Sequence, residues 1–476
     1  MARSSPAAVR AEPGGSDPDG QPRRVVWKFG GTSVADLGKV RAVAQRLANA
    51  HRDGTQVVAV LSAMGPTTDE LSGLAHQVSP LPPARELDAL LSAGEPISCA
   101  LTAIAVHELG VPAISLNAAQ AGLRTDDSYG NARLLRLTPQ RVIEALDSGA
   151  VVLVAGFQGA AANGDVTTLG RGGSDATAIA LALALGLKRC EIFTDVSGVF
   201  TADPRVVTNA RRLEWLSHEE MLHLALGGAQ VLQPRAVGLA AANGIDVHVR
   251  SSQSTEPGTW CLSAPRSEPG RATIVGVAHR SHEAVYTVAG MSPATVTDAL
   301  ARWGDYGGSV VSAGDRVHFT APGTDTAVVT AGLEQVGAQL SVQSGLGSVS
   351  IVAPADADWR SIVERIAAAL NGSGIEPHLW TTNDGRVCCH IPTEAVDRAA
   401  QVLHDAFDLQ RVDPDAATPP TGPRSAGPAG GFTAFPGRSA PPDGSAGRMH
   451  RGATAPPDPP RRPVPRPHAR IPTDQR

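Results

Sequence analysis

Short apolar runs alternate along the first half of the chain with segments whose apolar positions recur at the helical period. Such alternation predicts an α/β fold, in which a mostly parallel sheet is covered by helices on both faces. One helical face is formed by Leu37, Val40, Val43, Ala44 and Leu47. The expected strands are 23–29, 56–62, 150–157, 189–195 and 245–252, and further expected helices are 84–109, 175–186, 217–226 and 234–243. Together they define a first domain over residues 23–265.

The rhythm changes between residues 281 and 411, where one pattern occurs twice. Each copy predicts a strand, a helix, two strands and a second helix. The expected helices are 293–303 and 324–336 in the first copy, and 357–371 and 393–408 in the second. Two similar α+β units indicate a small paired module for regulation or dimerisation. A single irregular α+β domain is the alternative.

Composition adds limits on the ends of the chain and on its partners. Residues 1–22 and 412–476 are rich in Pro and Gly and poor in aliphatic residues, so we expect two disordered tails. The net charge of −5 gives no basic field for nucleic acid or a membrane surface. No secretion signal and no run of about 18 apolar residues is expected, which predicts a cytoplasmic protein. The five cysteines form no CxxC pair, so we expect reduced thiols and no metal site.

The strongest candidate for chemistry is the segment Lys28-Phe29-Gly30-Gly31-Thr32-Ser33, at the end of the first expected strand. Its glycines permit a tight turn and a close approach of backbone N–H groups to an anion. Lys28 supplies a positive charge for a phosphoryl group in transfer. We expect a helix to follow directly, with Thr32 or Ser33 capping it or contacting phosphate. Alone, a Gly-Gly pair more often marks an ordinary turn between a strand and a helix.

Two further loops carry candidate residues. The segment 167–175, TTLGRGGSD, opens a helix and brings an arginine, a glycine nest and a carboxylate close together. Arg171 suits a substrate carboxylate, and Asp175 could hold a catalytic lysine or a water on Mg²⁺. The segment 194–205, TDVSGVFTADPR, follows an apolar strand, where α/β sheets bind ligands. Taken singly, each could be an ordinary polar loop.

In this order and spacing, the three segments closely resemble those of the aspartate kinases in the amino acid kinase family. The resemblance extends through LSAMGPTTDEL, LLSAGEPIS, QAGLRTDDSYGNA and RSSQSTEPGT and covers nearly all of 24–262. It implies a three-layer αβα sandwich followed by two ACT-like βαββαβ units. It also implies transfer of the γ-phosphate of ATP to the β-carboxylate of L-aspartate. That reaction opens lysine, threonine and methionine synthesis or a dedicated specialised branch.

The resemblance also implies roles for individual residues. Lys28 would stabilise the transferring phosphoryl group and Asp175 would orient that lysine, while Arg171 and Glu95 would bind the α-carboxylate and α-ammonium of aspartate. The remaining substrate residues would be Ser62, Thr68, Phe157 and Ser174. The ATP site would comprise Lys28, Gly30, Gly31, Thr194, Asp195, Phe200, Arg205 and Gln230. Mg²⁺ would arrive with the nucleotide, without a dedicated protein cage.

Two positions on the nucleotide side depart from the family pattern. Gln230 stands where the family usually has a lysine that reaches the phosphates, and Phe200 stands where it has a tyrosine. Loss of a phosphate-facing charge costs about 1–3 kcal/mol. Arg235 could compensate. These changes keep open a second reading, a catalytically impaired kinase-like regulatory subunit, and a third is a sister kinase acting on glutamate.

The C-terminal module departs from the family pattern as well. The family opens the first helix of its effector unit with a glycine turn, where this chain has 291–295, MSPAT. An asparagine and an aspartate expected in the next strand are replaced by 307–311, GGSVV. We therefore expect a structural module that holds a homodimer or a higher oligomer together, with weak or absent feedback inhibition.

Overall fold

The computed structural model describes residues 23–263, 274–301, 310–322, 326–335 and 337–411. The two expected tails, 1–22 and 412–476, lie outside the described residues.

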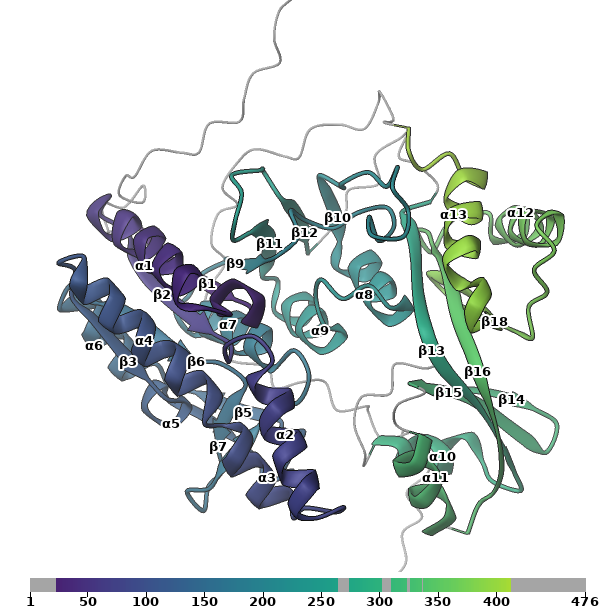
Figure 1. Ribbon diagram of the computed structural model, residues 1–476, viewed down its shortest axis with the longest axis horizontal. Coiled ribbons are helices and arrows are strands. Elements are labelled where there is room, and N and C mark those ends of the chain that lie inside the picture. Colours follow the sequence, from purple (N-terminus) through teal and green to yellow (C-terminus); the bar gives the residue numbers. More distant parts are fainter. Residues whose placement is uncertain (1–22, 264–273, 302–309, 323–325, 336, 412–476) are drawn as a thin grey trace, which may run out of the picture. The chain divides into compact units, whose positions relative to one another are not determined.

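An eight-stranded sheet forms the centre of the first domain (Figure 1). Its neighbouring strands are parallel with one exception, the antiparallel pair β11–β12, which confirms the mostly parallel sheet expected from the sequence. The order across the sheet is β10 (Trp215–Ser217), β12 (Thr259–Leu262), β11 (Asp246–Ser251), β9 (Arg189–Thr194), β1 (Arg24–Phe29), β2 (Gln56–Leu61), β6 (Val151–Ala155) and β3 (Ala113–Leu116).

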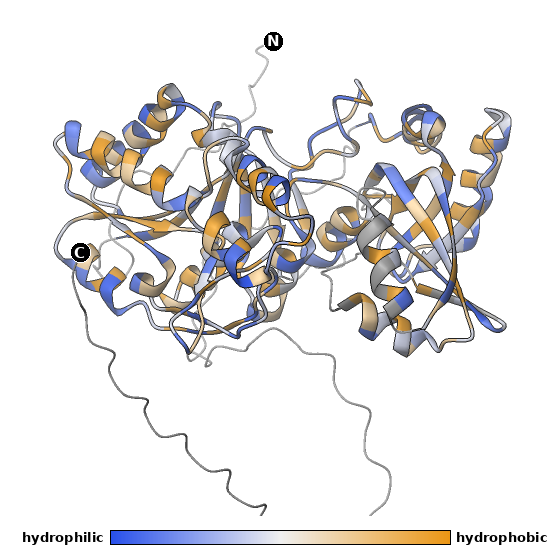
Figure 2. Ribbon diagram, turned by 60° about the horizontal axis from the view of Figure 1, so that its bottom comes forward, coloured by the Kyte–Doolittle hydropathy of each residue, from blue (hydrophilic) through white to orange (hydrophobic). Residues whose placement is uncertain are grey.

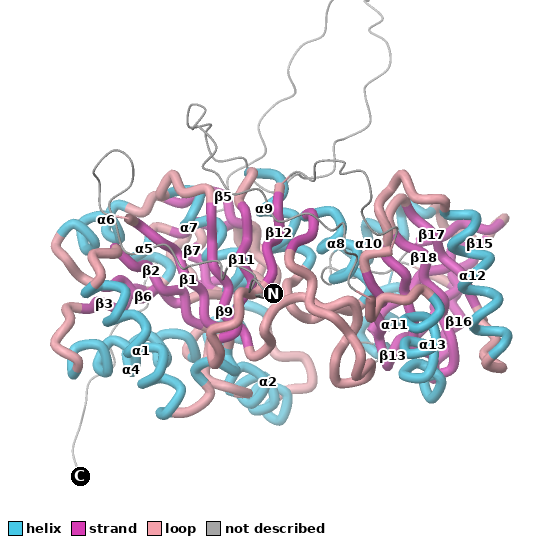
Figure 3. The backbone as a smooth tube through the Cα atoms, turned by 90° about the horizontal axis from the view of Figure 1, so that it is seen from above, coloured by secondary structure: helices cyan, strands magenta, loops and turns pink. Residues whose placement is uncertain are grey.

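Helices cover both faces of this sheet, which confirms the three layers (Figure 3). On one face, α1 (Leu37–Arg52) and α4 (Gly94–Glu108) bury residues such as Leu47 and Val106 against the strands. The other face is covered by α6 (Gln140–Asp147), α7 (Gly173–Ala184), α8 (His218–Gly227) and α9 (Pro234–Asn243). Figure 2 shows hydrophobic residues along the central strands and hydrophilic residues on the outward faces of several helices.

The first domain also contains a second, four-stranded sheet, which the sequence analysis did not predict. Its strands are β5 (Leu134–Leu137), β4 (Leu123–Thr125), β7 (Gln158–Ala160) and β8 (Val166–Thr168), in that order. Fully buried Asp88, on α3 (Ala84–Leu91), anchors it by accepting hydrogen bonds from the Gly130 N–H and from both the N–H and the hydroxyl of Thr168. Two more helices, α2 (Thr67–Val78) and α5 (Ala118–Ala121), complete this region.

The stretch Ala84–Glu108, which combines α3 and α4, is long and apolar enough to cross a membrane by length and composition alone. We expected no such stretch. Its α4 part packs in the core of the first domain, where Cys99, Ala103 and Val106 belong to the cluster beneath α1. Core packing therefore accounts for much of its apolar character.

The C-terminal module is one six-stranded antiparallel sheet shared by the two expected units. Its order is β14 (Val310–Ala313), β15 (Arg316–Pro322), β13 (Gly276–Ala289), β16 (Gln339–Val352), β18 (Arg386–Pro392) and β17 (Leu379–Asn383). Strands β13 and β16 run through both units, because residues 276–280 pair with 348–352 while 285–289 pair with 339–343. One strand of the second unit, the half of β13 at residues 276–280, therefore comes before the first unit in the sequence. The helices are α10 (Pro293–Ala301), α11 (Thr326–Gln335), α12 (Trp359–Gly372) and α13 (Val396–Ala406).

The end of α8 is bonded to strands of this module. Arg386 donates to the Leu226 carbonyl at 2.7 Å, and Arg280 donates to the same carbonyl at 3.1 Å. Gly228 follows with a φ of +119°, and a Cβ there would lie 2.1 Å from the carbonyl oxygen of His279. Only glycine fits this close approach in a left-handed conformation.

Candidate functional site

The three sequence segments meet at one edge of the central sheet. Strands β9, β1, β2 and β6 are neighbours and parallel, so their carboxyl ends lie side by side. Thr194 ends β9, Lys28 is the penultimate residue of β1, Ser62 follows β2, and Phe157 follows β6 by two residues. Open α/β sheets bind their ligands at such an edge, where neighbouring strand ends supply loops of different chemistry.

A buried ion pair lies at the centre of this edge. The Lys28 ammonium lies 2.6 Å from Oδ1 of Asp175, and the two side chains are 12% and 6% exposed. Lys28 comes from β1 and Asp175 from the first turn of α7. The pair therefore joins two of the three glycine-rich segments, and the sequence-based expectation that they meet agrees with this geometry.

The turn after Lys28 differs in detail from the expected strand-to-helix turn. The residues Gly31–Val34 form a 3-10 helix, and α1 begins only at Leu37, where the Asp36 carboxylate accepts from the Lys39 N–H at 2.9 Å. The expectation that Thr32 or Ser33 caps α1 is wrong. The Gly30 N–H is also occupied, because it donates to the Phe193 carbonyl at 3.1 Å. Gly31 is required by packing, since a Cβ would lie 2.9 Å from the Ala63 carbonyl oxygen.

The glycine loop before α7 presents an open helix N-terminus. Gly170 and Gly172 both have left-handed φ values, and no side chain caps the helix at Gly172. Arg171 between them is exposed and forms no hydrogen bond or ion pair with another described residue. Free N–H groups at a helix N-terminus and an unpaired guanidinium form a site for anions. Ser174, in the first turn, is buried.

Glu95 contributes a buried carboxylate to the same region. It is 2% exposed, and its Oε1 accepts from the Ala63 N–H at 3.3 Å. Its Oε2 is buried and has no hydrogen-bond partner among the described residues. Burial raises the pKa of this carboxyl group to about 7. A buried, unsatisfied acceptor of this kind suits a cationic group of a ligand.

The other expected substrate residues come from three different places in the chain. Ser62 is half-buried and its carbonyl accepts from the Ser98 hydroxyl at 2.7 Å, while Thr68 lies in the first turn of α2. Phe157 has a φ of +67°, one of two positive values among described non-glycine residues. Its carbonyl accepts from the Leu169 N–H at 2.8 Å, which ties it to the glycine loop.

The expected nucleotide residues are more exposed. The Thr194 hydroxyl donates to Asp195 at 3.0 Å, and Phe200 is half-buried. Arg205 donates to the Asp203 carboxylate with a shortest distance of 2.6 Å, which lowers the pKa of Asp203. Gln230 is exposed and has no hydrogen-bond partner among the residues described.

Arg235 has a structural role that the sequence analysis missed. Its guanidinium donates to the Asn131 side chain at 2.6 Å and to the Leu169 and Ala132 carbonyls, each at 2.5 Å. These acceptors hold Arg235 against the glycine loop, and its compensation for Gln230 stays a prediction. Its distance from the motifs along the sequence hid this role.

Three comparisons with known proteins agree with the geometry. Residues 23–251 match the model of the amino acid kinase family. The chain is 41% identical over 404 residues to an aspartokinase of Mycolicibacterium smegmatis, covering 81% of this chain and 96% of the relative. An aspartokinase of Corynebacterium glutamicum is 41% identical over 408 residues, covering 82% and 97%.

A solved structure, E. coli aspartokinase III in complex with aspartate and ADP, is also similar. The TM-score is 0.69 at 25% identity, covering 81% of this chain and 99% of that one. The fold, the meeting of the three segments around Lys28 and the similarity over 81% of the chain lead to one conclusion: this chain belongs to the aspartokinases of the amino acid kinase family.

Proposed function

We propose that this enzyme transfers the γ-phosphate of MgATP to the β-carboxylate of L-aspartate in the cytoplasm, giving 4-phospho-L-aspartate. The observation that carries the proposal is the buried Lys28–Asp175 pair, 2.6 Å apart, beside an uncapped α7 N-terminus. The reaction opens the aspartate family of amino acids, lysine, threonine and methionine, or a dedicated branch.

The chemistry needs positioning and charge more than proton transfer. A carboxylate is already a nucleophile, so neither a general base nor a covalent enzyme intermediate is required. Lys28, oriented by Asp175, neutralises charge that develops on the transferring group. The Mg²⁺ that accompanies ATP supplies further neutralisation at the phosphates. Gly30 and Gly31 shape the turn that lets the nucleotide approach this lysine.

Aspartate is recognised through the two charged groups on its Cα, which leaves the β-carboxylate free to react. Glu95 Oε2, buried and unpartnered, receives the α-ammonium group, and exposed Arg171 receives the α-carboxylate. Ser62, Thr68, Phe157 and Ser174 complete the substrate wall. The nucleotide side consists of Thr194, Asp195, Phe200, Arg205 and Gln230. Arg205 breaks its ion pair with Asp203 when it binds the phosphates.

The C-terminal module serves assembly more than feedback. The Ser292 hydroxyl accepts from the Thr295 N–H at 3.1 Å, so this residue satisfies the start of α10 from within the chain. An amino-acid effector would need such N–H groups free for its carboxylate. The other altered segment, 307–311, lies mostly outside the described residues. We propose a homodimer held by these units.

The first prediction tests catalysis. Trapping with hydroxylamine should detect aspartyl phosphate, and Lys28→Met should lower kcat by about 100- to 1000-fold, because a preorganised positive charge is lost. Exposed Lys188→Met is the matched control and should retain activity. Absence of product from the wild type would favour the impaired regulatory subunit, and preference for glutamate would favour the sister kinase.

The second prediction concerns pH. Glu95 must be ionised to pair with an ammonium group, so KM for aspartate should rise as pH falls below about 7. Glu95→Gln should raise KM by about tenfold or more at pH 8 and remove this inflection. Glu108→Gln, on the same helix, should leave it unchanged. An inflection that survives in Glu95→Gln would assign it to another group.

The same raised pKa fixes the sign of a stability effect. Because the unfolded glutamate titrates near its ordinary value of 4.5, the folded enzyme without substrate loses stability as pH rises from there to about 7. This loss should be absent from Glu95→Gln in denaturant titrations at the two ends of the window.

The third prediction concerns the altered nucleotide side. Gln230→Lys should lower KM for ATP by about tenfold, because it restores a charge toward the phosphates, while KM for aspartate changes little. Gln45→Lys, an exposed change on α1, controls for added charge. Equal KM values for ATP in the wild type and Gln230→Lys would show that this side chain does not reach the phosphates.

The fourth prediction concerns feedback. Initial rates should be unchanged by sub-millimolar lysine, threonine or both together, because the start of α10 is already capped. Strong inhibition at those concentrations would show that the module retains an effector site.

A further inference from the structure

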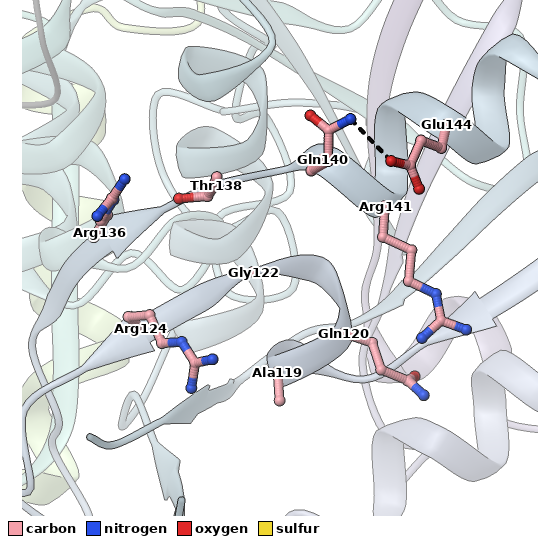
Figure 4. Close-up of a pocket in the computed structure, with 9 residues that line it drawn as sticks. All are labelled: Ala119, Gln120, Gly122, Arg124, Arg136, Thr138, Gln140, Arg141 and Glu144. Atoms are coloured by element: carbon pink, nitrogen blue, oxygen red, sulfur yellow. Dashed lines mark hydrogen bonds between the residues drawn. The ribbon is translucent and has the colours of Figure 1, made fainter. Parts of the chain in front are cut away.

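A pocket with a volume of about 510 Å³ lies between the β4–β5 hairpin and the start of α6 (Figure 4). None of the residues assigned above to catalysis, aspartate or ATP lines it. Three arginines do: Arg124 on β4, Arg136 on β5 and Arg141 on α6.

Two of these arginines are direct neighbours across the hairpin. Arg124 is the register partner of Arg136 in the antiparallel pair β4–β5. Both are exposed, whereas adjacent Leu123, Thr125 and Leu137 are buried, so the two guanidiniums share the outer face. Like charges directly opposite each other destabilise a hairpin. Neither arginine forms a hydrogen bond or ion pair with another described residue.

The third arginine stands at the unfavourable end of a helix. Arg141 is in the first turn of α6, where the helix dipole favours anions and disfavours cations. The helix begins after Pro139 without a side-chain cap, and the N–H groups of residues 140–142 have no acceptor among the described residues. Arg141 also has no described partner. The three arginines and the helix start therefore give the lining of this pocket an excess of positive charge.

The acidic side chain of the pocket does not balance these charges. Glu144 accepts a hydrogen bond from the Gln140 amide at 2.9 Å, as Figure 4 shows. The pocket lining thus contains one carboxylate and three guanidiniums, and the carboxylate is hydrogen-bonded to a residue of its own helix. The nearby acids Asp126 and Asp147 are paired with Arg133 and Arg24. The arrangement lowers the stability of the free protein unless an anion is bound.

We propose that this pocket binds a small phosphorylated anion, through Arg124, Arg136 and Arg141 together with the free N–H groups at the start of α6. A phosphate group fits better than a carboxylate, because it offers three acceptor oxygens and up to two charges to several donors at once. A diphosphate could span the hairpin and the helix. The proposal stands independently of the proposed function, since it uses none of the residues of that site.

The test is calorimetric titration of the full chain at constant ionic strength. With the kinase site filled by ADP, inorganic pyrophosphate should bind the wild type saturably. The double variant Arg124→Gln, Arg136→Gln should bind pyrophosphate with an affinity lower by about tenfold or more. Arg141→Gln should show a similar loss of affinity. Arg133→Gln, on the same hairpin but paired with Asp126, should bind it as the wild type does.

A titration with ADP alone distinguishes the source of the phosphate. A second equivalent of ADP, bound by the wild type and lost in the double variant, would identify a nucleotide. A single equivalent in both proteins, with pyrophosphate binding retained in the wild type, would identify a free phosphate compound. Both results support the site.

The melting temperature supplies an independent readout. Without added anion the double variant should melt at a higher temperature than the wild type, because the like-charge pair is removed. With the kinase site filled by ADP, pyrophosphate should raise the melting temperature of the wild type more than that of the variant. Equal pyrophosphate affinity in the two proteins would overturn the proposal. The absence of saturation at millimolar pyrophosphate would also overturn the proposal.

Discussion

The site depends on one interaction, the ion pair between Lys28 and Asp175. Both charges are buried, and such pairs contribute little net stability because desolvation offsets their attraction. Their value is positional. The pair fixes the lysine at the carboxyl edge of the sheet and joins β1 to the start of α7, so that the two glycine loops face one space. Removing either partner would leave a buried charge uncompensated.

The sequence predicted the parts that rest on local pattern. Long apolar strands such as β2 and β9 appeared with nearly correct bounds, and Lys28 and the segment 194–205 were expected at strand ends, as observed. Local pattern could not show β4, β5, β7 and β8, because strands of three or four residues carry too few positions for a period. Long-range side-chain contacts, such as those of Asp88 and Arg235, were equally hidden.

The sharing of β13 and β16 was hidden for a different reason. Each strand is continuous in sequence, but its two halves belong to different units. The register between β13 and β16 decides which halves pair with each other, and the sequence pattern does not reveal that register. The same sheet bonds to the last turn of α8, where Arg280 and Arg386 donate to the Leu226 carbonyl, four residues before Gln230. Hydrogen bonds thus hold the C-terminal sheet against the helix end that leads to Gln230, which we propose for the nucleotide side.

Phe157 carries backbone strain beside this site. A non-glycine residue with a φ of +67° costs about 1 kcal/mol or more relative to an extended conformation. Glycine would adopt that backbone without strain, and selection for stability alone would therefore favour it. Because we propose that this ring forms part of the aspartate wall, exchanging it for glycine would trade activity for stability, and engineering for heat resistance should leave this position unchanged.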